Sequence, residues 1–199
     1  MNRQRMSRWG RVLVPPALTE SMHINGRIRV RELPFDSPEE WRYWWLGEFN
    51  SAGQMVRAPR MSEREKDRYT VAESRNILVS SGITQLLTYI GSNSGNSTAF
   101  AQQFAVGNTA ISQVNSNDTS VAGEYFRAAP SASNVSGVQL DLSTLAGTSQ
   151  ANGVITNVGL FGNGATSTIG SGTMTTHSLF NYNKTSSNSV SFDYLLSYV

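Results

Sequence analysis

Residues 190–196 read Val-Ser-Phe-Asp-Tyr-Leu-Leu and place an apolar side chain at every second position. Because successive side chains of a β-strand point to opposite faces, Val190, Phe192, Tyr194 and Leu196 share one face. This pattern is typical of a half-buried strand, and it predicts that residues 190–199 form one.

The sequence before this run is organised in the same way. From Gly91 onward, short apolar runs alternate with stretches of Ser, Thr, Asn and Gly. Five further strands are predicted at 100–106, 121–128, 135–142, 153–161 and 173–180, with Gly-Asn or Asn-Gly pairs at 107–108, 152–153 and 162–164. This spacing predicts a mainly β fold, in the form of an antiparallel β-sandwich or jelly roll. A strand at 76–79 and a one-sided helix at 83–90 are predicted before it.

Charge and tryptophan are concentrated in the first third of the chain. Residues 1–70 contain 13 of the 16 Lys and Arg residues and all four Trp residues. The sequence therefore predicts an extended N-terminal arm at residues 1–72, with a short strand at 28–31 and a helix starting near Ser37, and a β-sandwich domain at residues 73–199. Because Trp and Arg carry much of the contact energy at interfaces, we expect the arm to lie on another protein.

The sharpest local feature of the arm is the run Trp41-Arg42-Tyr43-Trp44-Trp45. Three interpretations are open: the rings anchor a protein interface, form a small core of the arm itself, or stack against a sugar. The interface interpretation makes all five residues partner-binding residues, together with Trp9 and Arg127.

Only three basic residues, Arg75, Arg127 and Lys184, follow position 70, so we expect each of them to have a specific task. On a strand Glu124 and Arg127 point to opposite faces unless a bulge intervenes, so we expect each to reach a neighbouring strand or subunit rather than to pair with the other.

The sequence offers little for catalysis or for a cofactor. The chain has no cysteine, and His23 and His177 are far apart, which argues against a zinc site. The glycines at 162–164 lack the Lys-Ser/Thr pair and the helix pattern of a phosphate-binding loop. Asp118, Glu124 and Asp141 are interpreted as loop caps or partners of Arg127. We therefore expect a non-enzymatic protein without cofactor or metal.

Neither a membrane nor a nucleic acid is an expected partner. No apolar run reaches the roughly 18 residues that a spanning helix needs. The formal net charge of +2 is small, and acidic residues interrupt the arginines of the first third.

A series of short motifs between residues 73 and 199 resembles small structural proteins of tailed bacteriophages. They are Asn-Ile-Leu-Val at 76–79 with Gly82 and a short helix, Phe-Ala-Val-Gly at 104–107, residues 124–127, Val-Gly-Leu-Phe at 158–161, Leu-Phe at 179–180 and Asn-Lys-Thr at 183–185. The chain departs from the pattern at two positions, with Asn157 in place of an acid and His177 in place of an arginine. The resemblance implies a non-catalytic component of the virion.

The expected function is that of an accessory subunit, homo-oligomeric or present in many copies, which binds and staples neighbouring capsid subunits as a decoration or cement protein. In this hypothesis the strand at 28–31 pairs with an exposed sheet edge of a neighbour. A neck, tail or fibre-attachment protein is the first alternative, and a carbohydrate-binding adhesin module is the second.

Overall fold

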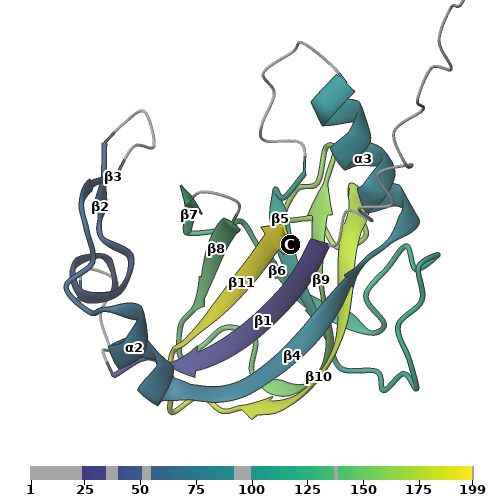
Figure 1. Ribbon diagram of the computed structural model, residues 1–199. Helices are drawn as coiled ribbons and strands as arrows, with labels where there is room; N and C mark the ends of the chain where they lie inside the picture. The colour runs from purple at the N-terminus through teal and green to yellow at the C-terminus, as the bar shows by residue number, and fades with distance from the viewer. Residues whose placement is uncertain (1–23, 35–39, 51–54, 92–99, 137–138, 199) are drawn as a thin grey trace, which may run out of the picture.

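The computed structural model describes residues 24–34, 40–50, 55–91, 100–136 and 139–198 (Figure 1). Nine strands form one sheet in the spatial order β6-β5-β9-β10-β4-β1-β11-β8-β7, and every neighbouring pair is antiparallel. The strands are β1 (Ile24–Glu32), β4 (Thr70–Leu78), β5 (Gln103–Gly107), β6 (Glu124–Ala128), β7 (Ala132–Ser136), β8 (Gln139–Ala146), β9 (Gly153–Gly162), β10 (Thr173–Lys184) and β11 (Val190–Tyr198).

The strand predicted at residues 190–199 is confirmed as β11. It pairs with β1 from Ile24↔Tyr198 to Glu32↔Val190. This register places Ile28 and Val30 on the same face as Phe192 and Tyr194, and all four side chains are buried. The alternate apolar side chains of β1 and β11 thus lie together in the core of the sheet.

The sheet curls until its two halves face each other across this core (Figure 1). The rings of Phe104 on β5 and Phe192 on β11, which are far apart in strand order, have centroids 4.8 Å apart. The two edge strands, β6 and β7, are joined only by residues 129–131, so the edges also come together at that end. Three residues span at most about 11 Å.

The mainly β, antiparallel prediction is therefore confirmed, whereas the two packed sheets of a sandwich or jelly roll are not. The nine strands form a single half-barrel. The run predicted as one strand at 135–142 is divided instead between β7 and β8, which form a hairpin.

The outer face of β5, β9 and β10 is also covered. A second apolar cluster lies there and consists of Val79, Ala105, Val121, Phe161, Ala165 and Met174. Two of its members, Val121 and Ala165, come from the segments 108–123 and 163–172 that follow β5 and β9. β9 is accordingly buried on both faces over most of its length.

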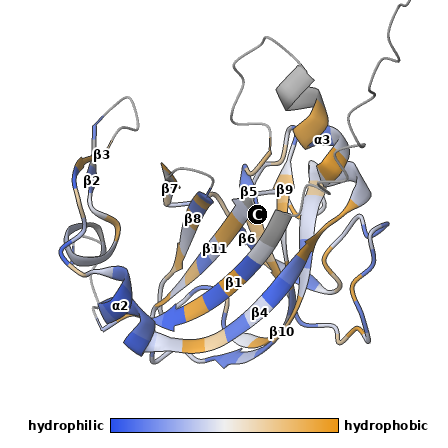
Figure 2. Cartoon of the chain, viewed as in Figure 1, coloured by the Kyte–Doolittle hydropathy of each residue, from blue (hydrophilic) through white to orange (hydrophobic). Residues whose placement is uncertain are grey.

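The prediction that residues 1–72 form an arm outside the domain needs correction. Strand β1 lies between β4 and β11 in the middle of the sheet, and β4 itself begins at Thr70. The physical reason is that β1 alternates between apolar and arginine side chains, which suits a strand with one face on the core and the other outside (Figure 2). Residues 1–23 lie outside the described residues.

An insertion lobe, defined here as residues 40–50 and 55–69, lies between β1 and β4 in the sequence and beside the sheet in Figure 1. Its elements are a π-helical turn η1 (Trp41–Leu46), the hairpin strands β2 (Glu48–Phe49) and β3 (Met55–Arg57), the helix α2 (Glu63–Lys66) and the 3₁₀ turn η2 (Asp67–Tyr69). The stretch interpreted as solvated at 62–67 is thus partly helical, because Ser62 and Glu65 form a capping box at its start.

The helix predicted at 83–90 is confirmed as α3 (Ser80–Gly91), which follows β4 directly and lies on β10. Gly82 lies so close to β10 that a Cβ atom there would be 2.1 Å from the carbonyl oxygen of Thr175. The missing side chain therefore allows the helix to approach the sheet.

We expect Gly82→Ala to lower the free energy of unfolding by about 1–3 kcal/mol, because the new methyl group meets backbone that cannot move aside cheaply. In an ordinary helix interior the same change would stabilise the protein by roughly 0.5–1 kcal/mol. The sign of the change in unfolding free energy therefore shows whether the helix approaches β10 as closely as described. Urea denaturation measures it. Gly147→Ala is the control, since its nearest neighbour would be 3.7 Å away. A Gly82→Ala protein at least as stable as the natural chain would contradict the close approach.

Candidate protein-binding surface

Arg31 attaches the insertion lobe to the sheet. It lies on the outer face of β1, and its side chain is only 3% exposed. Its guanidinium group contacts Asp193 of β11 at 2.9 Å, Asp67 of η2 at 2.7 Å and Glu63 of α2 at 3.1 Å. Burial alone would lower the pKa of Arg31, but these carboxylates raise it overall, so the group stays charged. One buried cation thus joins three elements.

Two of the four tryptophans form a small core between the lobe and the sheet. Trp41 and Trp45 are buried together with Leu33 and Leu46, and Leu145 of β8 packs against this group. The side chains of Arg31 and Lys66 lie 5.9 and 5.6 Å from the centroid of the Trp45 ring. For these two rings the structure agrees with the small-core interpretation.

The neighbouring rings, those of Tyr43 and Trp44, are less buried. Tyr43 and Trp44 are half-buried and meet edge to face, with centroids 5.4 Å apart. The guanidinium carbon of Arg60 lies 4.3 Å from the Tyr43 ring centroid and 5.4 Å from that of Trp44. We call Tyr43, Trp44 and Arg60 the aromatic–arginine cluster. The backbone holds it in place through the hydrogen bond from Met61 N–H to Trp44 O at 3.0 Å.

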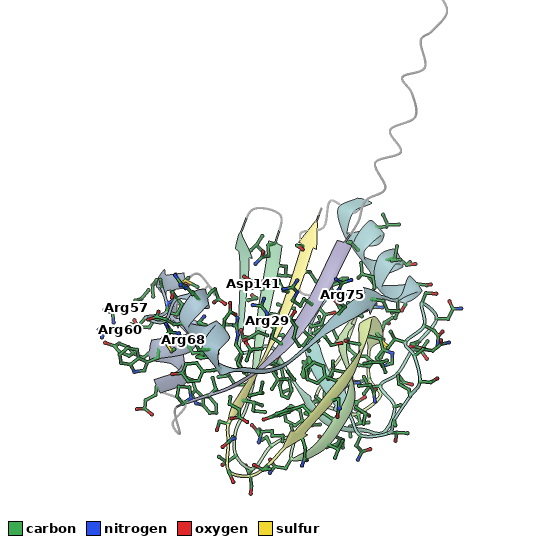
Figure 3. All side chains as sticks on the ribbon, turned by 60° about the horizontal axis from the view of Figure 1, so that its bottom comes forward. Arg29, Arg57, Arg60, Arg68, Arg75 and Asp141 are labelled. Carbon is green, nitrogen blue, oxygen red and sulfur yellow. The ribbon has the colours of Figure 1, made fainter. Side chains whose placement is uncertain are left out.

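Further exposed groups extend this surface along the β2–β3 hairpin. Met55 and Val56 are 41% and 61% exposed, and Arg57 forms an exposed ion pair with Glu48. Figure 3 shows Arg57 and Arg60 at the outer end of the lobe, whereas Arg29, Arg75 and Asp141 lie on the sheet. Apolar side chains bordered by arginines are typical of protein-binding surfaces.

The sequence marked the run from Trp41 to Trp45 as a whole and did not separate its two sides. The π-helical turn places Trp41 and Trp45 inside and leaves Tyr43 and Trp44 partly accessible. Trp9 and the side chain of Arg42 lie outside the described residues. Arg127 belongs to β6 and is not part of the lobe.

Arg127 instead forms a buried ion pair with Glu124 on the same strand. Their side chains are 0% and 5% exposed, and Arg127 Nη2 donates to Glu124 Oε2 at 2.8 Å. The opposite-face expectation was wrong at this point because the β5–β6 ladder contains a bulge: Val106 pairs with Phe126, while Gly107 pairs with Glu124. The guanidinium carbon of Arg127 also lies 4.0 Å from the Phe161 ring centroid.

A polar network that the sequence did not reveal fixes the segment 108–123 to the sheet. The Asn157 side chain is fully buried, accepts from Ala122 N–H at 2.9 Å and donates to the carbonyl oxygens of Thr109 and Ala122. This fixes its amide oxygen toward His177 Nε2 at 3.2 Å. His177 Nδ1 lies 2.6 Å from Asp118 Oδ2, so the imidazole ring lies between a carboxylate and an amide oxygen.

The carboxyl group of Asp118 has an altered pKa in this network. Burial alone would raise its pKa, but the backbone N–H of Asn115 and the contact with His177 lower it below its ordinary value of 3.8. Asp118 is thus the loop cap expected from the sequence. Asn157 and His177, the two departures from the phage-like pattern, lie together in this network.

Lys184, another of the three basic residues after position 70, is also a buried cation. It is 1% exposed, and its ammonium group donates to Gly147 O at 2.9 Å, to Asn152 Oδ1 at 2.8 Å and to Thr185 O at 3.2 Å. Burial lowers the pKa of this ammonium group. Through these three hydrogen bonds, Lys184 connects the β8–β9 turn to the end of β10. Its role is therefore structural.

Across the described residues, no three His, Asp or Glu side chains gather as the ligands of a metal would. No helix in the described part of the chain has the length and apolar character needed to cross a membrane. Comparison with known protein families, curated proteins and solved structures gives no match to this chain.

We expect Arg127→Ala to lower the free energy of unfolding by about 3–5 kcal/mol, because it leaves the Glu124 carboxylate buried without its partner. Chemical denaturation of the purified variant measures the loss. The matched control is Arg64→Ala in the exposed part of α2, which should change stability by less than about 0.5 kcal/mol. Equal stabilities of the two variants would show that the Arg127 pair contributes nothing.

Acidification should weaken the Asp118 network. Because the pKa of Asp118 is lower in the folded state, its contribution is fully present above pH 3.8 and is lost as the pH falls through the lower, folded-state pKa. Between pH 6 and 2, we expect the unfolding free energy of the natural chain to fall more steeply than that of Asp118→Asn. Urea unfolding at each pH gives the two curves.

Asp141→Asn is the control with the opposite sign. Burial, and after it the charges of Glu63 and Asp193, raise the pKa of Asp141, so its carboxyl group contributes to stability at low pH rather than at high pH. In Asp141→Asn, the unfolding free energy should fall between pH 6 and 2 as steeply as in the natural chain, or more steeply. Parallel curves for Asp118→Asn and the natural chain would refute the assigned role of Asp118.

Proposed function

We propose that this chain is a non-enzymatic structural protein of a tailed-phage virion, an accessory subunit that binds and staples neighbouring capsid subunits. The aromatic–arginine cluster is the observation that carries the proposal. It brings two aromatic rings and a guanidinium group together on a lobe that projects from the sheet. Trp, Tyr and Arg are the residues most often found as binding hot spots. The phage-like series of motifs between residues 73 and 199 supports the virion assignment.

The attachment of the lobe favours binding of a protein partner. Arg31, Trp41 and Trp45 fix the lobe to the sheet through buried contacts. A partner therefore meets rings that are already positioned, and little conformational entropy is lost on binding. Many copies on a particle multiply the strength of each such contact.

The position of β1 changes the proposed mode of stapling. Residues 28–31 already pair with both β4 and β11, so they are not available to extend a neighbour's sheet. The free edges of the sheet belong to β6 and β7 instead. We therefore assign contact with the neighbouring subunit to the insertion lobe.

The two alternatives make different demands on the same surface. A neck, tail or fibre-attachment protein would use the aromatic–arginine cluster in the same way but at another place in the particle. A carbohydrate-binding module needs an open ring face for stacking, and Arg60 already lies over the Tyr43 ring. The geometry therefore favours a protein partner over a sugar.

The test of location uses particles purified from the phage that encodes this chain. Mass spectrometry should detect the chain in them, and cryo-electron microscopy should place it on the head in a defined number of copies. Density at the neck or tail would support the first alternative. Absence from the particles would end the virion proposal, and binding of the purified protein to a glycan array would favour the adhesin.

Particles assembled with the Tyr43→Ala/Trp44→Ala variant test the surface itself. We expect incorporation to fall by at least about tenfold, because hot-spot residues contribute about 2 kcal/mol or more each, while the melting temperature changes little. Trp45→Ala is the matched control, since loss of this buried ring should lower the melting temperature. Full incorporation of a folded Tyr43→Ala/Trp44→Ala protein would exclude the cluster as the anchor.

A further inference from the structure

Helix α3 is seated on β10 in one fixed orientation. Val79 N–H donates to Thr175 O at 3.1 Å, and Ser81 Oγ donates to Met174 O at 2.7 Å. Gly82 is buried directly over Thr175. These contacts determine which side of the helix faces the sheet and which side faces away.

This orientation exposes apolar side chains and buries a polar one. Ile83 and Leu87, one helical turn apart, are 45% and 57% exposed. The amide nitrogen and oxygen of Gln85 are buried, with no hydrogen-bond partner among the described residues. A surface helix normally shows the reverse arrangement, with its apolar side inside. The pair Ile83 and Leu87, here called the α3 apolar pair, is therefore suited to contact a further segment.

The first described strand begins close to α3. The described residues begin at Ile24, at the start of β1. Gly26 of β1 pairs with Asn76, and β4 continues from there to Leu78 and into α3, so β1 begins at the end of the sheet that carries α3. A ten-residue stretch spans up to about 35 Å, and α3 is only about 18 Å long.

The sequence of residues 1–23 contains one concentrated apolar run, Val12-Leu13-Val14. Pro15 and Pro16 follow it, and the fixed φ of proline lowers the entropy that docking costs. We propose that residues 12–14 cover the α3 apolar pair within the same chain. The N-terminal segment is then a strap across α3, independent of the surface on the insertion lobe.

A single introduced cysteine tests this contact in the full-length protein, which has none of its own. Thr84→Cys places the thiol at an exposed position of α3, next to Ile83 in the sequence and three residues before Leu87. We expect a polar maleimide to label it about tenfold more slowly than in a second protein in which Val12, Leu13 and Val14 are all serine. Circular dichroism verifies that both proteins are folded.

Val56→Cys is the matched control, because Val56 is 61% exposed. It belongs to β3, which lies on the opposite side of the sheet from α3 (Figure 1). Its labelling rate should be the same with either N-terminal sequence. Equal rates at residue 84 in the two backgrounds would overturn the proposal. Slow labelling that disappears on dilution would also overturn it, because the covering segment would then come from a second copy.

Discussion

The antiparallel pairing of β1 with β4 on one side and with β11 on the other is the constraint on which the sheet depends. Without it, the strands fall into two separate groups, one ending at β4 and one ending at β11. The register of these pairs also determines the core, because it places Ile28 and Val30 inside. A slip of one residue would turn Arg29 and Arg31 into the apolar interior, where their charges would lack partners. The sheet is therefore specified by one short alternating strand.

The same alternation links the fold to the candidate surface. One face of β1 supplies the core, and on the other face Arg31 holds the insertion lobe through carboxylates from three elements. The cluster of Tyr43, Trp44 and Arg60 is thereby carried on a rigid support rather than on a loose arm. A rigid aromatic surface is what repeated, specific contact between subunits requires.

Local patterns were sufficient to predict most of the strands and α3, because alternation and helical spacing are recorded within a few residues. The position of each strand within the sheet could not be predicted from such patterns. Ile24, for example, pairs with Tyr198, and nothing in the sequence around either residue identifies the other as its partner. The bulge opposite Gly107, which brings Glu124 and Arg127 to the same face, could not be predicted because it depends on the pairing of β6 with β5. The contact of His177 with Asp118 and Asn157 likewise depends on residues far apart in sequence. Within the tryptophan run, the π-helical turn decided which rings are buried.

The pairing of Ile24 with Tyr198 has a consequence for synthesis on the ribosome. β1 ends at Glu32, but one of its two neighbours, β11, begins only at Val190 and is therefore translated much later. At about 5–20 residues per second, β1 waits on the order of ten seconds with one edge unpaired. During this time the apolar face of β1 is an aggregation hazard, and the arginines at every second position from Arg27 to Arg31 act as gatekeepers beside it. The charges that later hold the lobe thus also protect the nascent chain.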